Sequence, residues 1–247
     1  MGQYRRLLSL FDYTGQWATP FAENGWDVIC WDIKLDEFMD INLLTDVETV
    51  LDLFDSVDGI IAAPPCTWFT NASAQYWPKY DLEGKTEQAH EFVRQVMRLV
   101  DLYQPTDPEY DDGFFWALEN PVGRIGNVTG LGKPLVYFDP WEYAGYLKHT
   151  KKDIAELDRI REKNGIGVTN EEAAFVVAQN AYTKKTGLWG EFLVPTKKPI
   201  QSIKTCKQGS FTQRLGGKSA KTKELRSVTP MGFAYAFYEF QQLLYND

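Results

Sequence analysis

The first half of the chain alternates apolar segments of strand length with amphipathic segments, and this alternation most constrains the fold. The apolar segments are residues 6–11, 27–31, 59–63 and 114–118. Between residues 87 and 103 the apolar side chains recur at a spacing of three to four, which predicts a helix. Strands that alternate with helices are typical of a parallel sheet covered on both faces. We therefore predict an α/β fold with a doubly wound sheet. Shorter helices are expected at 17–24 and 47–54.

The second half of the chain is interpreted as mostly helical and loop-like. Residues 149–181 are predicted to form a helical insertion, with one helix over 154–163 and a second that Asn170 is expected to cap. A strand is predicted at 186–194, followed by a basic loop at 195–223.

The final helix is predicted to begin near Thr229, with Pro230 in its first turn. These patterns divide the chain into three parts. They are residues 1–148, the helical insertion 149–181, and residues 182–247, which combine a basic segment with the last helix.

Composition indicates a globular protein of a reducing compartment. Hydrophobic residues make up 44% of the 247 residues, and no apolar run approaches the roughly 20 residues that cross a bilayer. The apolar stretch near the N-terminus is too short for a signal peptide, so we expect a cytoplasmic protein. Three scattered cysteines do not suggest a disulfide framework, and the two histidines lack metal-ligand spacing. We expect no metal site.

Positive charge is concentrated in one segment. The chain has a formal net charge of −8, but residues 182–226 hold eleven basic residues and two acidic ones, so that segment carries +9 and the rest −17. Phosphate contacts are made chiefly by Lys and Arg, so the segment is a candidate nucleic-acid contact. A solvated flexible loop is the alternative interpretation.

Two polar motifs follow the first two predicted strands. Gly15 closes the turn after the first strand and would let the backbone approach a ligand. The spacing G-x-G-x-x-G is missing, which disfavours nicotinamide or flavin binding. Asp32, directly after the second strand, is suited to accept hydrogen bonds from ribose hydroxyls, and a surface Asp with no such role is the alternative.

Two further motifs carry candidate reactive groups. Cys66 follows Pro64 and Pro65 at the carboxyl end of the third strand, which suits a nucleophile better than a buried filler. Glu119 precedes Asn120 at the end of the fourth strand, where its carboxyl group could act as an acid toward a ring nitrogen. A helix-capping or ion-paired Glu is the alternative.

In this order the motifs resemble those of the DNA cytosine-5 methyltransferase family. The similar segments are SLFDYTG, WDI at 31–33, DI at 40–41, APPC at 63–66, ENP at 119–121, YTKKTGLW at 182–189 and LRSVTPMGFAYAF at 225–237. The resemblance covers most of the chain except 149–181. It departs from the family in having one glycine in the first motif, Pro121 in place of valine, and lysines in the basic motif.

The resemblance implies a Rossmann-like methyltransferase sheet with a small, reduced target-recognition region, about 35 residues from Gly190 to Glu224. It implies S-adenosylmethionine as cofactor and double-stranded DNA as partner. It also implies that 1–148 is the cofactor-binding and catalytic domain and that 182–247 contacts DNA and completes it. Compact bacteriophage enzymes are the most similar members, which suggests a host cytoplasm and protection against restriction-modification systems.

The resemblance also assigns roles to single residues. The implied catalytic residues are Cys66, Glu119, Asn120 and Pro65. The implied cofactor-binding residues are Phe11, Thr14, Gly15, Asp32, Ile33, Asp40, Ile41 and Pro64. The implied DNA-binding residues are Lys184, Lys185, Arg214, Lys218 and Arg226.

Other functions stay open at this point. The chain could modify carbon-5 of a free nucleotide, although the basic segment favours a polymer. It could also be a catalytically silent relative that binds DNA or a host protein. An amino-methylating DNA enzyme is disfavoured because Cys66 replaces the aromatic residue expected after the prolines. The residues do not indicate an oligomeric state, a target sequence or the final product.

Overall fold

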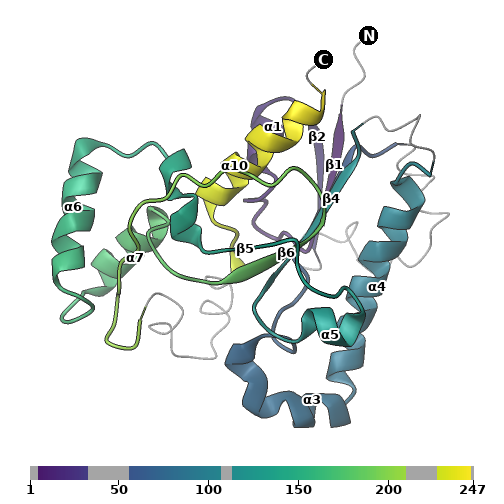
Figure 1. The fold of residues 1–247 in the computed structure, drawn as a ribbon, viewed down its shortest axis with the longest axis horizontal. Coiled ribbons are helices and arrows are strands. Elements are labelled where there is room, and N and C mark those ends of the chain that lie inside the picture. The colour runs from purple at the N-terminus through teal and green to yellow at the C-terminus, as the bar shows by residue number, and fades with distance from the viewer. Residues whose placement is uncertain (1–4, 33–55, 107–112, 210–226, 246–247) are drawn as a thin grey trace. The chain divides into compact units, whose positions relative to one another are not determined.

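The computed structural model describes residues 5–32, 56–106, 113–209 and 227–245. These residues form an α/β fold with a six-stranded mixed sheet (Figure 1). The strands are β1 (Arg6–Leu10), β2 (Asp27–Trp31), β3 (Gly59–Ala62), β4 (Phe115–Pro121), β5 (Val136–Phe138) and β6 (Thr186–Glu191). The helices are α1 (Thr19–Glu23), α3 (Trp77–Leu82), α4 (Lys85–Tyr103), α5 (Ile125–Thr129), α6 (Lys151–Glu162), α7 (Asn170–Ala178) and α10 (Met231–Gln241). The predicted helix at 47–54 lies outside the described residues.

The strand order β2-β1-β3-β4-β6-β5 contains a reversal next to β1. β1 pairs in parallel with β2 on one side and with β3 on the other, and β3 pairs in parallel with β4. The chain therefore runs outward from β1 to β2 and then returns to the opposite side of β1. In open α/β sheets, ligands bind at the carboxyl ends of the strands where the order reverses. The ends of β1 and β3 are thus the expected position of a site.

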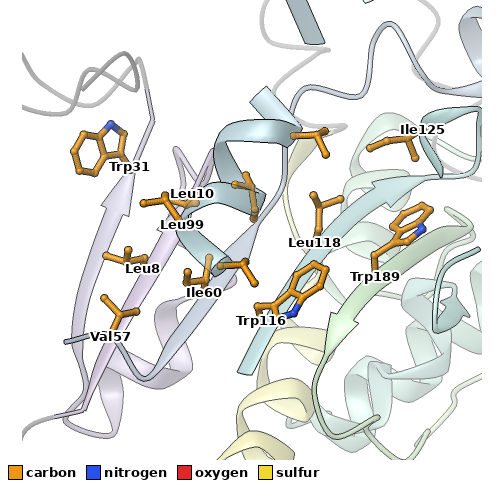
Figure 2. Packing of buried hydrophobic residues seen from close by; sticks show 14 of the residues in the cluster. Leu8, Leu10, Trp31, Val57, Ile60, Leu99, Trp116, Leu118, Ile125 and Trp189 are labelled. Atoms are coloured by element: carbon orange, nitrogen blue, oxygen red, sulfur yellow. The ribbon is translucent and has the colours of Figure 1, made fainter. Parts of the chain in front are cut away.

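One face of the sheet packs against α4. Alternate residues of the parallel strands, among them Leu8, Ile60 and Leu118, share one buried cluster with Leu99 of α4 (Figure 2). The long helix was predicted because its apolar residues recur every three to four positions, and it begins two residues earlier than predicted, after Gly84. Burial of this stripe supplies the main apolar contact of the helix.

The other face packs against α1 and the turn that follows it. Phe115 of β4 stacks on Phe21 of α1 with ring centroids 5.9 Å apart and meets Trp26 at 6.1 Å. An added Cβ at Gly59 of the neighbouring strand would lie 2.4 Å from the Phe115 ring. The prediction of a sheet covered on both faces is therefore confirmed, and the ring fills the space that the glycine leaves.

β6 runs antiparallel to β4, which makes β4 longer than predicted. The pairing extends from Trp116 opposite Glu191 to Pro121 opposite Thr186. The motif at 119–121 was expected to follow the strand, but it forms the last three residues of β4 because β6 continues the ladder beyond the end of β3. β6 ends at Glu191, three residues before the predicted end.

The chain divides into two compact units. The first contains residues up to Tyr137, Thr186–Leu193, and the chain from Gln241 onward. The second contains Phe138–Lys185 and Val194–Phe240. The division thus falls at Tyr137, whereas the sequence suggested a boundary at residue 148. The two predicted helices of the 149–181 segment, α6 and α7, both belong to the second unit.

Side-chain caps begin both helices of that segment. The Thr150 hydroxyl accepts a hydrogen bond from the Asp153 N–H, and Thr169 does the same for Glu172. The predicted cap of the second helix was wrong by one position, because Thr169 and not Asn170 closes this capping box. Threonine followed three residues later by an acid was the stronger signal.

We predict that the α4-packed face determines the stability of the first unit. Leu8→Ala should lower the free energy of unfolding by about 2–5 kcal/mol, since Leu8 is fully buried and truncation leaves a cavity. Leu82→Ala is the control and should change it by less than about 0.5 kcal/mol, because Leu82 is 90% exposed. Urea denaturation measures both. Equal losses in the two variants would contradict this packing.

Candidate active site

The register of the parallel strands aligns the ends of β1, β2, β3 and β4. Leu10 pairs with Trp31 and with Ala62, and Ala62 pairs with Leu118. The residues that follow this aligned row therefore come at neighbouring strand ends. They are Phe11, Asp32, Ala63 and Glu119. Four motifs that lie far apart in the sequence are brought to one edge of the sheet.

The loop after β3 presents Cys66 at this edge. Ala63 extends the pairing with β1 through an N–H bond to the Leu10 carbonyl (3.0 Å), and the prolines that follow have no N–H to continue it. Pro64 is buried, while Pro65 and Cys66 are half-buried. The Cys66 carbonyl accepts hydrogen bonds from the N–H groups of Phe69 (3.0 Å) and Thr70 (2.9 Å). The backbone behind the thiol is thus closed into a turn.

Asn120 joins the Cys66 loop to β4. Its side chain is fully buried, and its Nδ2 donates a hydrogen bond to the Pro64 carbonyl at 3.1 Å. Its Oδ1 has no hydrogen-bond partner among the described residues. The amide therefore fixes the separation of two neighbouring strand ends, the one that carries Cys66 and the one that carries Glu119.

Glu119 is a buried carboxyl group at the end of β4. It is 6% exposed. Side chains alternate along a strand, and Leu118 packs on the α4 side, so Glu119 projects to the α1 side. A carboxyl group in this position can exchange a proton or a hydrogen bond with a ligand at the edge.

A second connection joins the chain after Cys66 to the chain after Glu119. Thr70 and Gly123 form an antiparallel bridge, and the Asn71 N–H donates to the Val122 carbonyl at 3.0 Å. A Cβ at Gly123 would lie 1.9 Å from the Phe69 carbonyl oxygen, so only glycine allows the two backbones to come this close. The chain after Cys66 and the chain after Glu119 are therefore held together.

The turn after β1 has an unusual backbone. Phe11 adopts a left-handed conformation (φ 60°), donates its N–H to the Trp31 carbonyl at 2.6 Å, and packs edge-on against Phe92 of α4. Gly15, predicted to close this turn, is also left-handed (φ 64°), and Thr14 is exposed. A left-handed residue other than glycine costs about 1–3 kcal/mol, so the contacts around Phe11 must hold the turn in this shape.

Asp12 is a site residue for which the sequence suggested no role. Its carboxylate accepts hydrogen bonds from the Ser9 hydroxyl at 2.9 Å, from the Thr14 hydroxyl at 3.4 Å and from the Ala18 N–H, while the Gly15 N–H donates to the Asp12 backbone carbonyl at 3.0 Å. Burial raises the pKa of Asp12 above its usual value, although these hydrogen bonds oppose the shift. The signal was Ser9, a polar residue in an apolar strand, followed three positions later by an acid.

The neighbouring Cys30 differs from Cys66 in its surroundings. It pairs with Ser9 across β1 and β2, and burial, together with the Asp12 charge, raises the pKa of the Cys30 thiol to about 11. A thiol with this pKa stays protonated near neutral pH and is a poor nucleophile.

The remaining predicted residues fall in three groups. Asp32 directly follows β2 and is half-buried. Lys184 is half-buried and Lys185 exposed; they come just before β6 and belong to the second unit. The other six lie outside the described residues; they are Ile33, Asp40, Ile41, Arg214, Lys218 and Arg226.

No protein-family model and no curated protein matches this chain. Within the described ranges, no group of three or more His, Cys, Asp or Glu side chains could hold a metal ion. No described helix combines the length and apolar character that a bilayer crossing requires.

We predict that Asp12 makes stability depend on pH. A carboxyl group whose pKa is raised on folding destabilises the folded state once it ionises, so this penalty grows as pH rises from about 3.8 through the folded-state pKa. Asp12→Asn cannot ionise. The unfolding free energy of the wild type should therefore fall relative to that of Asp12→Asn over this interval, as measured by urea denaturation from pH 4 to 8. A difference that stays constant with pH would contradict the burial of an ionisable Asp12.

Proposed function

We propose that the protein is a DNA methyltransferase that acts on carbon-5 of cytosine, with Cys66 as the nucleophile. The observation that carries the proposal is the alignment of the Cys66 loop with Glu119 on neighbouring strand ends, joined by the hydrogen bond from Asn120 to Pro64. A thiol and a carboxyl group held in this way can act on two atoms of one small ring. The ordered motifs of the sequence point to the same chemistry.

The proposed reaction needs both groups because carbon-5 of cytosine is a weak nucleophile. The Cys66 thiolate adds to carbon-6, and Glu119 supplies a proton or hydrogen bond at ring nitrogen-3, so that electron density moves to carbon-5. After carbon-5 is methylated, its proton is lost to a base, the bond from Cys66 to carbon-6 breaks, and the aromatic ring is restored. These atoms lie within the DNA duplex, so the base must be flipped into the site.

The charges at this edge suit S-adenosylmethionine better than a nucleotide diphosphate. The side chain of Asp12 already accepts a hydrogen bond from the Ala18 N–H at the start of α1, where other α/β proteins bind phosphate. Asp32 and Glu119 add two more carboxyl groups. A cationic sulfonium compound is compatible with such an acidic surround, and when bound it supplies the electrophilic methyl group. Asp32 would hold the ribose, and Phe11, Thr14, Gly15 and Pro64 would line the site.

DNA contact is proposed for the basic segment 182–226. Its charge of +9 contrasts with −17 for the rest of the chain. Lys184 and Lys185 are the described residues of the proposed phosphate-binding set, which also includes Arg214, Lys218 and Arg226. Phosphate contacts position a protein on DNA, while contacts to base edges specify the sequence.

Covalent trapping tests this function. We expect wild-type protein to form a stable complex with duplex DNA containing 5-fluorocytosine when S-adenosylmethionine is present, because the fluorine cannot leave as the proton does. Cys66→Ala should form none, and Glu119→Gln should form it about 10²–10⁴ times more slowly. Cys206→Ala, a half-buried cysteine of the second unit, is the matched control and should trap like wild type. Trapping that survives Cys66→Ala would refute the assignment.

A second measurement tests the substrate. The short recognition region predicts methylation of a very short or loosely defined target, read by bisulfite sequencing of DNA from cells that express the protein. A long, strictly required target would contradict this expectation. Methylation of free cytidine nucleotides, with none in DNA, would favour a nucleotide-modifying enzyme. DNA binding without trapping would favour a silent binding protein.

A further inference from the structure

The guanidinium group of Arg124 contacts the turn formed by residues 66–70, here called the Cys66 turn. Arg124 directly follows the Gly123 bridge, four residues after Asn120, and its side chain is 13% exposed. Its Nε donates a hydrogen bond to the Trp68 carbonyl at 3.2 Å, and its backbone N–H donates to the Phe69 carbonyl at 2.9 Å. Arg124 thus holds two consecutive carbonyl groups of the turn that begins at Cys66.

The same side chain is anchored to two helices. Its Nη1 and Nη2 bind the two carboxylate oxygens of Asp81 in α3 at 2.8 and 2.7 Å, and Nη2 also donates to the Thr86 hydroxyl of α4 at 2.8 Å. Thr86 in turn donates to Asp81 at 2.5 Å. The guanidinium carbon lies 4.7 Å from the centre of the Trp77 ring. These hydrogen bonds, that to Arg124 first, lower the pKa of Asp81 to about 2.

This arrangement uses the geometry of arginine and not only its charge. A guanidinium group offers five N–H donors in a rigid planar fork, and here that fork meets a carboxylate, a hydroxyl and a backbone carbonyl together. A lysine at the same position keeps the charge but cannot bind both carboxylate oxygens in parallel and has no Nε donor. The Cys66 turn is therefore connected to α3 and α4 through one planar group.

We propose that Arg124 is a positioning residue that holds the Cys66 turn against α3 and α4, so that the thiol keeps a fixed place relative to Glu119. The inference rests on the proposed function, in which the sulfur must reach one ring atom while the carboxyl group acts on another. A displacement of about 1 Å can slow a well-oriented reaction about 100-fold. Arg124 does not touch the ring in this scheme and acts through the backbone of residues 68 and 69.

Arg124→Lys is the principal test, in the full-length chain. We expect trapping on 5-fluorocytosine DNA to slow about 10- to 100-fold, while the Kd for DNA changes less than about twofold. A residue that only stabilised the fold would lower the amount of active protein without changing the rate per folded molecule. Arg98→Lys is the matched control, since Arg98 in α4 is half exposed and forms a surface ion pair with Glu91 at 3.4 Å. That variant should trap at the wild-type rate.

A second readout does not depend on catalysis. In a background with Cys30→Ser and Cys206→Ser, the rate at which a small disulfide reagent modifies Cys66 should change at least about threefold in Arg124→Lys and not in Arg98→Lys, because the turn that sets thiol exposure loosens. Thr86→Val, which removes one acceptor of the guanidinium group, should give a smaller change in the same direction. It serves as the test if Arg124→Lys does not fold.

The outcomes separate the two proposals. Wild-type protein that never traps would overturn the proposed function, and with it the catalytic meaning of the positioning. Unchanged trapping in Arg124→Lys, or an unchanged rate of Cys66 modification, would overturn the role of Arg124 alone. A loss of DNA affinity that accounts for the whole loss of trapping would show that Arg124 serves binding, which also contradicts the proposal.

Discussion

The hydrogen bond from the Asn120 side chain to the Pro64 carbonyl is the contact on which the proposed chemistry depends. Proline ends the β3 ladder because it has no N–H, so the loop that carries Cys66 leaves the sheet without backbone pairing to β4. Asn120 replaces that pairing with one side-chain bond of 3.1 Å inside the protein. Further along the chain, the backbone bridge between Thr70 and Gly123 and the hydrogen bond from the Arg124 guanidinium group to the Trp68 carbonyl join the same loop to the segment after β4. Three contacts of different kinds thus join the same two segments.

Much of the sheet could be predicted from the sequence, because β1, β3 and β4 are almost wholly buried and consist mainly of apolar residues. The strand at 27–31 was predicted with its observed limits, and α4 was found from its periodicity. The end of β4 was not predicted correctly. Its last residues pair with β6, which is distant in the sequence, and a local sequence pattern carries no information about such a partner. The cap at Thr169 was missed by one residue for a different reason: Thr169 and Asn170 are both good caps, and the acid at Glu172 decides between them.

The candidate site was predictable where a motif coincides with a strand end, as at Cys66 and Glu119. Asp12 could not be assigned in this way, because its role depends on the fold of the turn around it. The carboxylate accepts a bond from Ser9 and another from the start of α1, and only the folded turn brings these donors together. Arg124 was likewise absent from the predicted site, since its partners come from two helices and a loop. Sequence motifs locate reactive groups better than the groups that support them.

The position of β6 late in the sequence affects how the chain folds during synthesis. A ribosome releases β1 to β4 well before Thr186–Glu191, so the open edge of β4 must wait for a strand made much later. Non-local pairing of this kind slows folding and leaves an unprotected edge that can join another chain. The same connectivity also tolerates changes of length, because one of the two segments of the second unit lies between β5 and β6. Lengthening or shortening that segment leaves the strands that carry the reactive groups in their order.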